Sequence, residues 1–204
     1  MRAAPDDSQP ATLVLASTSR YRRELLERLR LPFSSVPPRV VEDAWVGENP
    51  EDLAVRLARL KAEAVAAQHP GAVVIGSDQV AELDGDCLAK PMTVERCIQQ
   101  LQRSSGRSVR FLTAVCVIDG RATGAANVES HLDNTAVQFR LLGLPEIRRY
   151  VEIDQPLDCA GGFKAESLGI TLFEEIRSHD PTALMGLPLI WLSDALRRAG
   201  FAAP

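Results

Sequence analysis

A short apolar strand that runs directly into the start of a helix constrains the fold of this chain more than any other feature. The strand occupies residues 12–16, and the hydroxyl residues 17–19 (STS) follow it where a helix begins. Serine and threonine cap helix N-termini because their side-chain oxygens accept backbone N–H groups that no helical carbonyl satisfies. These N–H groups and the helix dipole attract anions. The segment therefore predicts a strand-to-helix unit with an anion site between the two elements.

Two arginines, Arg22 and Arg23, stand in the first turn of this helix, where the dipole disfavours positive charge. A bound polyphosphate would stabilise them there, because guanidinium groups match the geometry of phosphate oxygens. Solvated surface arginines are the alternative, and the segment alone is compatible with both interpretations.

Strand and helix patterns alternate along the rest of the chain, which is typical of an α/β protein. Helices are expected at residues 20–29, with Leu25, Leu26 and Leu29 buried, and at 50–68, 93–105, 144–153 and from 188 onward. Strands are expected at residues 12–16, 72–75, 107–119, 127–140 and 170–176. Residues 1–10 are expected to form a disordered leader before a single domain at 11–204.

Polar residues follow two further apolar stretches. The buried-strand pattern at 72–75 leads into Asp78 and Gln79, and then into an acidic hairpin with an Asp84-Gly85 turn before Lys90. A glycine-rich polar segment occupies residues 156–166. Ligands in open α/β sheets bind near the carboxyl ends of strands. We therefore expect the three polar segments to converge on one site.

The bulk properties exclude several classes of protein. The 204 residues suffice for one sizeable domain or two small lobes that share a cleft. The net charge of -4 argues against a general nucleic-acid binder, whose surface is basic. No apolar run approaches the about 18 residues that span a membrane, and the first ten residues lack a signal-peptide core. The cytoplasm is the predicted location.

Missing motifs narrow the chemistry. The four cysteines form no CxxC pair and are not spaced like a zinc site, so they are expected to be reduced and mostly packed thiols: Cys87, Cys97, Cys116 and Cys159. The three histidines are scattered and form no HExxH motif. The chain also lacks the G-x-S-x-G elbow, the Walker A pattern and the G-x-G-x-x-G fingerprint. Serine hydrolases, P-loop NTPases and the usual dinucleotide enzymes are therefore excluded.

Five blocks give the chain a family resemblance. It resembles the Maf family of nucleotide pyrophosphatases, also called septum-formation inhibitors, at residues 15–33, 56–65, 75–91, 158–170 and 185–189. The blocks occur in the family's order and at its spacing. The sequence is most similar to the branch acting on 7-methyl-GTP, because an aromatic residue, Tyr21, precedes the arginine pair. The second block also reads Ser-Asp-Gln where the dTTP/UTP branch usually has Ala-Asp-Thr, and the fourth carries Phe-Lys-x-Glu.

The resemblance implies a mixed sheet in an elongated two-lobe molecule with a central cleft, often as a homodimer. It also implies hydrolysis between the α and β phosphates of 7-methyl-GTP, which gives 7-methyl-GMP and pyrophosphate and keeps modified nucleotides out of nucleic acids. Water attacks phosphorus in this reaction, so the site must neutralise anionic charge and orient one water molecule.

Matching positions assign roles at the phosphate end. Asp78 is expected to be the catalytic base and, with Glu42, a ligand of Mg²⁺ or Mn²⁺, because hard cations prefer carboxylate oxygens. The triphosphate contacts are expected to be Ser17, Arg22, Arg23, Lys61 and Lys90. A turn-capping role for Asp78 and a solvated helix face for Lys61 are the structural alternatives. Two positions depart from the family. Val41 replaces an acidic residue, which leaves Asp43 as the alternative to the favoured Glu42 for the second carboxylate. Arg20 replaces a proline, with an expected local effect on the helix entrance.

The base end should recognise a cationic ring, because N7-methylation makes guanine a cation near neutral pH. The face of Tyr21 attracts such a ring. Glu166 can accept hydrogen bonds from the guanine edge, and Gln79 can offer both a donor and an acceptor. The alternatives are a surface aromatic for Tyr21 and an ordinary loop charge for Glu166.

Three other functions stay open at this point. The family's older name implies a regulator that arrests cell division by protein interaction. A nucleic-acid binding module is disfavoured by the acidic balance of the chain. Within the enzyme class, the alternative is a pyrophosphatase for another modified nucleotide or for a pyrimidine nucleotide.

Overall fold

The computed structural model describes residues 11–121 and 126–202. The predicted leader at residues 1–10 lies outside the described residues. Within these ranges, seven strands form one mixed sheet in the order β2-β1-β3-β5-β6-β7, and β4 pairs with β3 beside this path. The strands are β1 (Leu13–Ala16), β2 (Ser34–Ser35), β3 (Val73–Leu83), β4 (Asp86–Leu88), β5 (Ser108–Asp119), β6 (Asn127–Phe139) and β7 (Phe173–Arg177).

Five α-helices and three short 3₁₀ helices accompany the sheet in the described residues. They are α1 (Arg20–Glu27), α2 (Pro50–Ala66), α3 (Val94–Ser104), α4 (Leu144–Asp154), α5 (Leu189–Arg198), η1 (Ala160–Gly162), η2 (Leu168–Leu172) and η3 (Ala183–Met185). Among the described residues, no helix is both long and apolar enough to cross a membrane.

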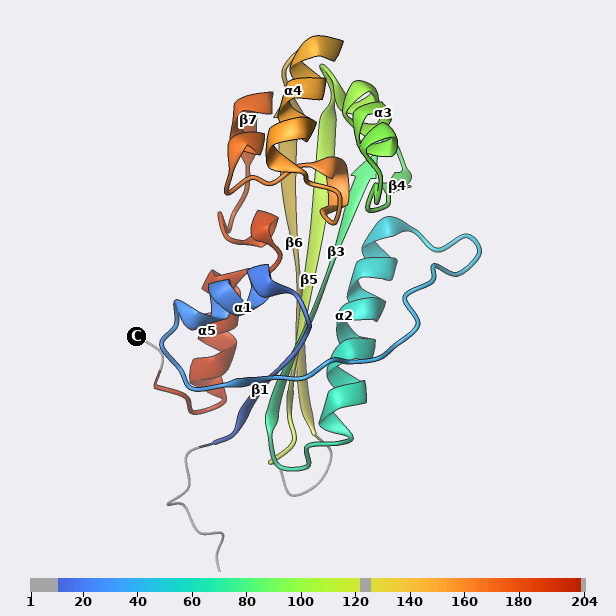
Figure 1. The fold of residues 1–204 in the computed structure, drawn as a ribbon. Helices are drawn as coiled ribbons and strands as arrows, with labels where there is room; N and C mark the ends of the chain where they lie inside the picture. Colours follow the sequence, from blue (N-terminus) through green and yellow to red (C-terminus); the bar gives the residue numbers. More distant parts are fainter. Residues whose placement is uncertain (1–10, 122–125, 203–204) are drawn as a thin grey trace, which may run out of the picture.

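The long strands β3, β5 and β6 run the length of an elongated molecule (Figure 1). β1 pairs in parallel with β2 and β3, whereas β3, β5 and β6 pair antiparallel. The first lobe gathers β1, α1, α2 and α5 around one end of these strands, and the second lobe gathers β4, α3, α4 and β7 around the other (Figure 1). The short strand β2 belongs to the first lobe, because it pairs with β1. The mixed α/β fold with two lobes, expected from the sequence, is thus confirmed.

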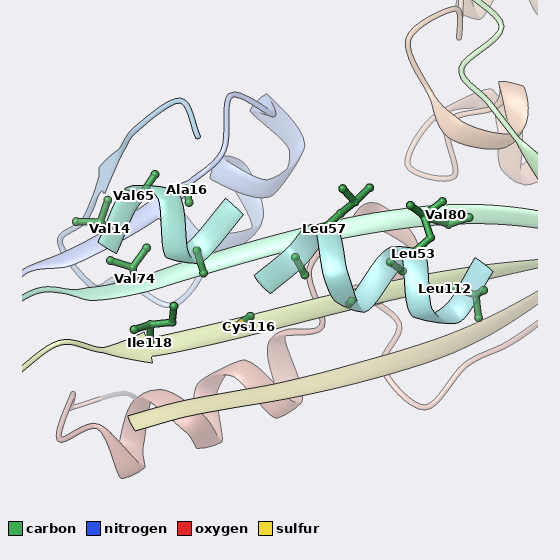
Figure 2. Packing of buried hydrophobic residues seen from close by; sticks show 14 of the residues in the cluster. Val14, Ala16, Leu53, Leu57, Val65, Val74, Val80, Leu112, Cys116 and Ile118 are labelled. Atoms are coloured by element: carbon green, nitrogen blue, oxygen red, sulfur yellow. The ribbon is translucent and has the colours of Figure 1, made fainter. Parts of the chain in front are cut away.

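The first lobe buries both faces of its sheet because side chains alternate along each strand. From β1, Val14 and Ala16 pack under α2, together with Leu57 of that helix, as Figure 2 shows. Leu13 and Leu15 point to the other face and pack with α1 and α5. The second lobe has its own core, in which α3 and α4 cover the far ends of β3, β5 and β6.

Two strand predictions need correction. β3 does not end at residue 75 but continues to Leu83, because its hydrogen bonding to β5 extends from Val73 to Glu82 after the shorter β1 has ended at Ala16. Asp78 therefore lies inside a strand and not after one. The strand expected at 170–176 is replaced by η2 and then β7, because the chain turns at residues 168–172 to bury Leu172 in the second lobe.

Most other expected boundaries agree with the structure to within about two residues. Thr93 caps α3 by accepting the Arg96 N–H, as predicted. The Asp84-Gly85 turn joins β3 to β4, and both of its residues have positive φ. Leu25 and Leu26 of α1 are buried, whereas Leu29 lies beyond the end of the helix and is partly buried.

Gly76 sets the distance between α2 and β3. A Cβ atom at this position would lie 2.2 Å from the Ala58 carbonyl oxygen and 2.6 Å from the Ala62 nitrogen. Gly76→Ala should therefore separate the helix from the sheet and lower the free energy of unfolding by about 3 kcal/mol, the upper range for overpacking. Chemical denaturation measures this. Gly143→Ala is the control, because its Cβ would meet only Pro145 at 3.8 Å, and a similar loss in both variants would contradict the explanation.

Candidate active site

A cavity of about 700 Å³ lies between the lobes. Its walls include residues 17–22 after β1, residues 78–79 of β3 and six residues around η1: Asp158, Cys159, Ala160, Phe163, Ala165 and Glu166. The three polar segments that the sequence predicted to converge therefore line one cavity. Residues 37–40 and Glu42, before α2, and residues 184–186, after β7, also line it, as do Lys61, Lys90 and Phe111.

Two serines at the start of α1 give one wall of the cavity the features of an anion-binding site. Ser19 is the N-cap of α1, and its hydroxyl accepts the Arg22 N–H at 3.4 Å. Ser17 is buried, and its oxygen accepts the Ser19 N–H at 3.1 Å. In the described part of the chain, the Ser17 hydroxyl donates to no protein acceptor. Its hydrogen is therefore available to a phosphate oxygen.

The two arginines of α1 have different surroundings. Arg22 lines the cavity, and its Nε donates to the Gly186 carbonyl at 2.9 Å. Burial lowers the pKa of the Arg22 guanidinium, and the nearby carboxylates of Asp78 and Glu42 oppose this shift. Arg23 is exposed and is not among the residues that line the cavity. The triphosphate contact assigned to Arg23 therefore gains no support from the geometry and stays a prediction.

Lys61 joins the two predicted acidic residues. Its Nζ lies 2.6 Å from Asp78 Oδ1 and 3.0 Å from Glu42 Oε1. Lys61 is 5% exposed and Asp78 is 7% exposed, so the solvated-face and turn-capping alternatives are both wrong. The three groups come from α2, β3 and the segment before α2, and all three line the cavity. An ammonium between two carboxylates places opposite charges where a phosphate could be bound and a water molecule oriented.

The same cluster offers two carboxylates to a divalent cation. No group of three or more His, Cys, Asp or Glu side chains in the described residues could hold a metal by itself. The carboxylates of Asp78 and Glu42 lie close together, because both contact the Lys61 ammonium. Mg²⁺ is typically held by one or two carboxylates, with substrate phosphates and water completing its coordination. The donor set therefore fits a metal that arrives with a triphosphate.

The predicted base-reading residues line the cavity as well. Tyr21 is half-buried, and its hydroxyl lies 3.9 Å from Cys159 Sγ. Burial raises the pKa of the Tyr21 phenol, so the ring stays neutral at physiological pH. Glu166 and Lys90 are exposed at the cavity wall. The family resemblance predicts that all of them belong to one site, and the structure brings them to one cavity.

Gln79 presents only its oxygen to a ligand, which corrects the expectation of both a donor and an acceptor. Its Nε2 donates to Thr113 Oγ1 at 2.9 Å and approaches the carbonyls of Ala183 at 3.1 Å and Leu184 at 3.0 Å. These contacts use both amide hydrogens. Oε1 meets no donor among the described residues, so it can act as an acceptor, which suits a base edge that carries N–H donors.

The segment after β7 holds the site together, and the sequence did not assign it a role. The Gly186 carbonyl accepts from Arg22 and also from Ser77 Oγ at 3.0 Å. Thr113 Oγ1 donates to the Ala183 carbonyl at 3.0 Å. Gly186 has φ 106°, which a side chain would strain. A glycine between apolar residues at 185–189 was the only signal in the sequence, and it does not reveal which carbonyls accept these hydrogen bonds.

The chain is similar in sequence to known proteins over most of its length. The sequence model of the family described as Maf-like protein matches residues 12–199. A 7-methyl-GTP pyrophosphatase of Xanthomonas campestris pv. campestris (strain 8004) is 57% identical over 194 residues, covering 94% of this chain and 98% of the relative. A 7-methyl-GTP pyrophosphatase of Bordetella parapertussis is 54% identical over 191 residues, covering 94% of each chain. A solved HAM1 protein from Coxiella burnetii has a TM-score of 0.47 and 17% identity, covering 93% of this chain and all of that one, which is too distant for an argument.

Proposed function

The chain belongs to the Maf-like protein family, and from that premise we propose that it hydrolyses 7-methyl-GTP to 7-methyl-GMP and pyrophosphate. The observation that carries the proposal is the cluster of Asp78, Lys61 and Glu42 in the wall of a cavity that also holds Tyr21, Gln79 and Glu166. The cluster supplies the charges for phosphoryl chemistry, and the second group supplies the contacts for a purine base.

The polar residues of the cavity have different roles toward the triphosphate and the attacking water. Arg22 and Lys90 neutralise phosphate oxygens, and the Ser17 hydroxyl donates to a neutral or anionic oxygen. Asp78 orients the attacking water and accepts its proton, while Lys61 keeps the Asp78 carboxylate in place. Preorganised charge of this kind is the main contribution a protein makes to phosphoryl transfer. The pyrophosphate then leaves with its negative charge already matched.

A divalent cation is the proposed cofactor. Asp78 and Glu42 would hold it together with phosphate oxygens. When bound, such a metal neutralises charge on the phosphates and polarises the phosphorus toward attack. Val41 replaces an acidic residue of the family pattern, so Glu42 is the only carboxylate that this segment brings to Lys61 in the described residues.

At the base end, the charges match a methylated guanine. The Tyr21 face attracts a cationic ring, worth about 0.5–2 kcal/mol depending on desolvation. The Gln79 oxygen and the Glu166 carboxylate accept the N–H donors of the guanine edge. A pyrimidine nucleotide would not present the cationic ring, so this part of the site favours the 7-methyl-GTP assignment.

Product analysis tests the proposal. A panel of 7-methyl-GTP, GTP, dTTP and UTP is incubated with the protein and Mg²⁺ or Mn²⁺, and the products are separated by ion-exchange chromatography. We expect 7-methyl-GMP and pyrophosphate, with 7-methyl-GTP as the best substrate. Release of orthophosphate would place the cut at another bond, and a preference for dTTP or UTP would assign the enzyme to the pyrimidine alternative.

Chelation is expected to silence the enzyme, and added Mg²⁺ or Mn²⁺ is expected to restore it. Glu42→Gln removes one of two carboxylates and should raise the metal concentration for half-maximal rate by about tenfold, the lower range for weakened metal sites. Mn²⁺ binding by electron paramagnetic resonance, in the presence of product nucleotide, provides a readout besides activity. Full activity in excess EDTA would remove the metal from the reaction.

Substitutions should distinguish the residues that recognise the base from those that bind the phosphates. Tyr21→Ala and Glu166→Gln should lower kcat/KM for 7-methyl-GTP about tenfold more than for GTP, because only the methylated base is a cation. Lys90→Ala should lower both values alike, since it removes a phosphate contact. The measurement is kcat/KM for both nucleotides in all three variants. Equal losses in Tyr21→Ala and Glu166→Gln would leave a pyrophosphatase without this base recognition.

Assembly and location complete the proposal. We infer a homodimer from the family resemblance, and light scattering coupled to size-exclusion chromatography tests it. Its substrate belongs to the nucleotide pool, so the cytoplasm stays the predicted location. A role in arresting cell division by protein interaction is separable from hydrolysis, because a catalytically inactive Asp78 variant should keep any effect that depends on binding alone.

A further inference from the structure

Arg20 lies over the aromatic ring of the base site. Its guanidinium carbon is 4.8 Å from the centroid of the Tyr21 ring, within the about 6 Å of a cation–π contact. Both side chains line the cavity. Arg20 is exposed and Tyr21 is half-buried, so the ring is the fixed partner and the arginine the movable one. The face of Tyr21 is therefore a cation site that already has a cation of the protein on it.

The surroundings keep both partners in the required state. An arginine stays protonated in proteins, so Arg20 always carries its charge. Burial raises the pKa of the Tyr21 phenol, which leaves the ring neutral, and the contact between its hydroxyl and Cys159 Sγ at 3.9 Å fixes one edge of the ring. Asp158 also lines the cavity and has a favourable charge interaction with Arg20, so the guanidinium has an acidic neighbour when it leaves the ring.

We propose that Arg20 determines how strongly the site prefers 7-methylguanine over guanine, by competing with the cationic base for the face of Tyr21. This inference rests on the proposed function. The base has to displace the guanidinium to reach the ring, and only the methylated, cationic base gains the cation–π attraction for which the guanidinium competes. Arg20 therefore reduces a selectivity that Tyr21 creates.

Removal of Arg20 should raise the preference for the methylated base. The ratio of kcat/KM for 7-methyl-GTP to that for GTP should increase about two- to fivefold in Arg20→Ala, corresponding to the loss of an exposed cation–π competitor. Using the ratio cancels any loss of general attraction for the triphosphate, which affects both nucleotides. Arg20 is the first residue of α1, where proline is tolerated, so Arg20→Pro is a second variant that should fold and behave alike.

A double-mutant cycle tests whether Arg20 acts through Tyr21. In a Tyr21→Ala background, Arg20→Ala should leave the ratio unchanged, because no ring remains to compete for. Arg39→Ala is the matched control: Arg39 lines the same cavity, is exposed and stacks on no aromatic ring in the described part of the chain. It should leave the ratio unchanged in both backgrounds.

The outcomes separate this inference from the proposed function. If the wild-type protein releases no pyrophosphate from 7-methyl-GTP, the proposed function fails. If it does and the ratio in Arg20→Ala is unchanged or falls, only the inference about Arg20 fails. An increase that persists in the Tyr21→Ala background, or that Arg39→Ala reproduces, would assign the effect to general charge and also overturn the competition.

Discussion

Asp78→Asn is expected to lower kcat by about 10²–10⁴-fold while the protein stays folded, the range typical for the loss of a general base. The Asp78 side chain is buried in β3 and lies 2.6 Å from the Lys61 ammonium. Asparagine keeps the shape of the side chain and can still accept a hydrogen bond from Lys61, but it cannot take a proton from water. Glu42 remains as an ionic partner for Lys61, which limits the loss of stability.

Glu82→Gln is the matched control for this substitution. Glu82 belongs to the same strand, is equally buried and is also ion-paired, with Arg110 Nε at 2.5 Å, but it does not line the cavity. The Glu82→Gln variant should therefore keep the wild-type activity. The measurement is single-turnover hydrolysis of 7-methyl-GTP with circular dichroism as the folding check. Retention of more than about a tenth of the wild-type rate in Asp78→Asn would exclude Asp78 as the base.

The sequence predicted which residues belong to the site better than it predicted which of them contact one another. Hydroxyl residues after β1, a polar segment at 78–79 and a glycine-rich segment at 158–166 mark the places where the chain meets the cavity. Only the first of them follows the end of a strand, because residues 78–79 lie inside β3 and the third segment surrounds η1. The pairing of Lys61 with Asp78 and Glu42 was not predicted, because residues 17 and 19 positions apart meet only when α2 packs against β3. Local patterns carry no signal for such contacts.

The misplaced end of β3 has a similar physical origin. An apolar run followed by Gly76, Ser77 and Asp78 is typical of a strand that ends, since polar side chains usually mark turns. Here the strand continues because its neighbour β5 extends beyond β1 and supplies hydrogen bonds as far as Glu82. The orientation of the Gln79 amide escaped prediction for the same reason, because its partners Ala183 and Leu184 lie more than a hundred residues away.

Lys61→Met is expected to lower kcat/KM about 10²–10³-fold for every nucleotide, the range found when one preorganised group is removed from a charged transition state. Methionine fills much of the same volume, so the loss comes from the charge. The substitution leaves Asp78 buried without its 2.6 Å partner, and breaking a buried ion pair from one side costs about 3–5 kcal/mol. Because Asp78 and Glu42 both approach Lys61, stability and catalysis should fall together.

A double variant separates the two effects. In Lys61→Met/Asp78→Asn no buried charge is left unpaired at these two positions, so unfolding in urea should show a smaller loss of stability than the sum of the single variants, while hydrolysis stays as low as in Asp78→Asn alone. Lys164→Met is the control, since the Lys164 ammonium donates to the Asp154 carbonyl at 2.6 Å and does not line the cavity. Additive stability losses would mean that the 2.6 Å pair contributes nothing. A Lys61→Met enzyme with wild-type kcat/KM would show that the catalytic carboxylate needs no ammonium beside it.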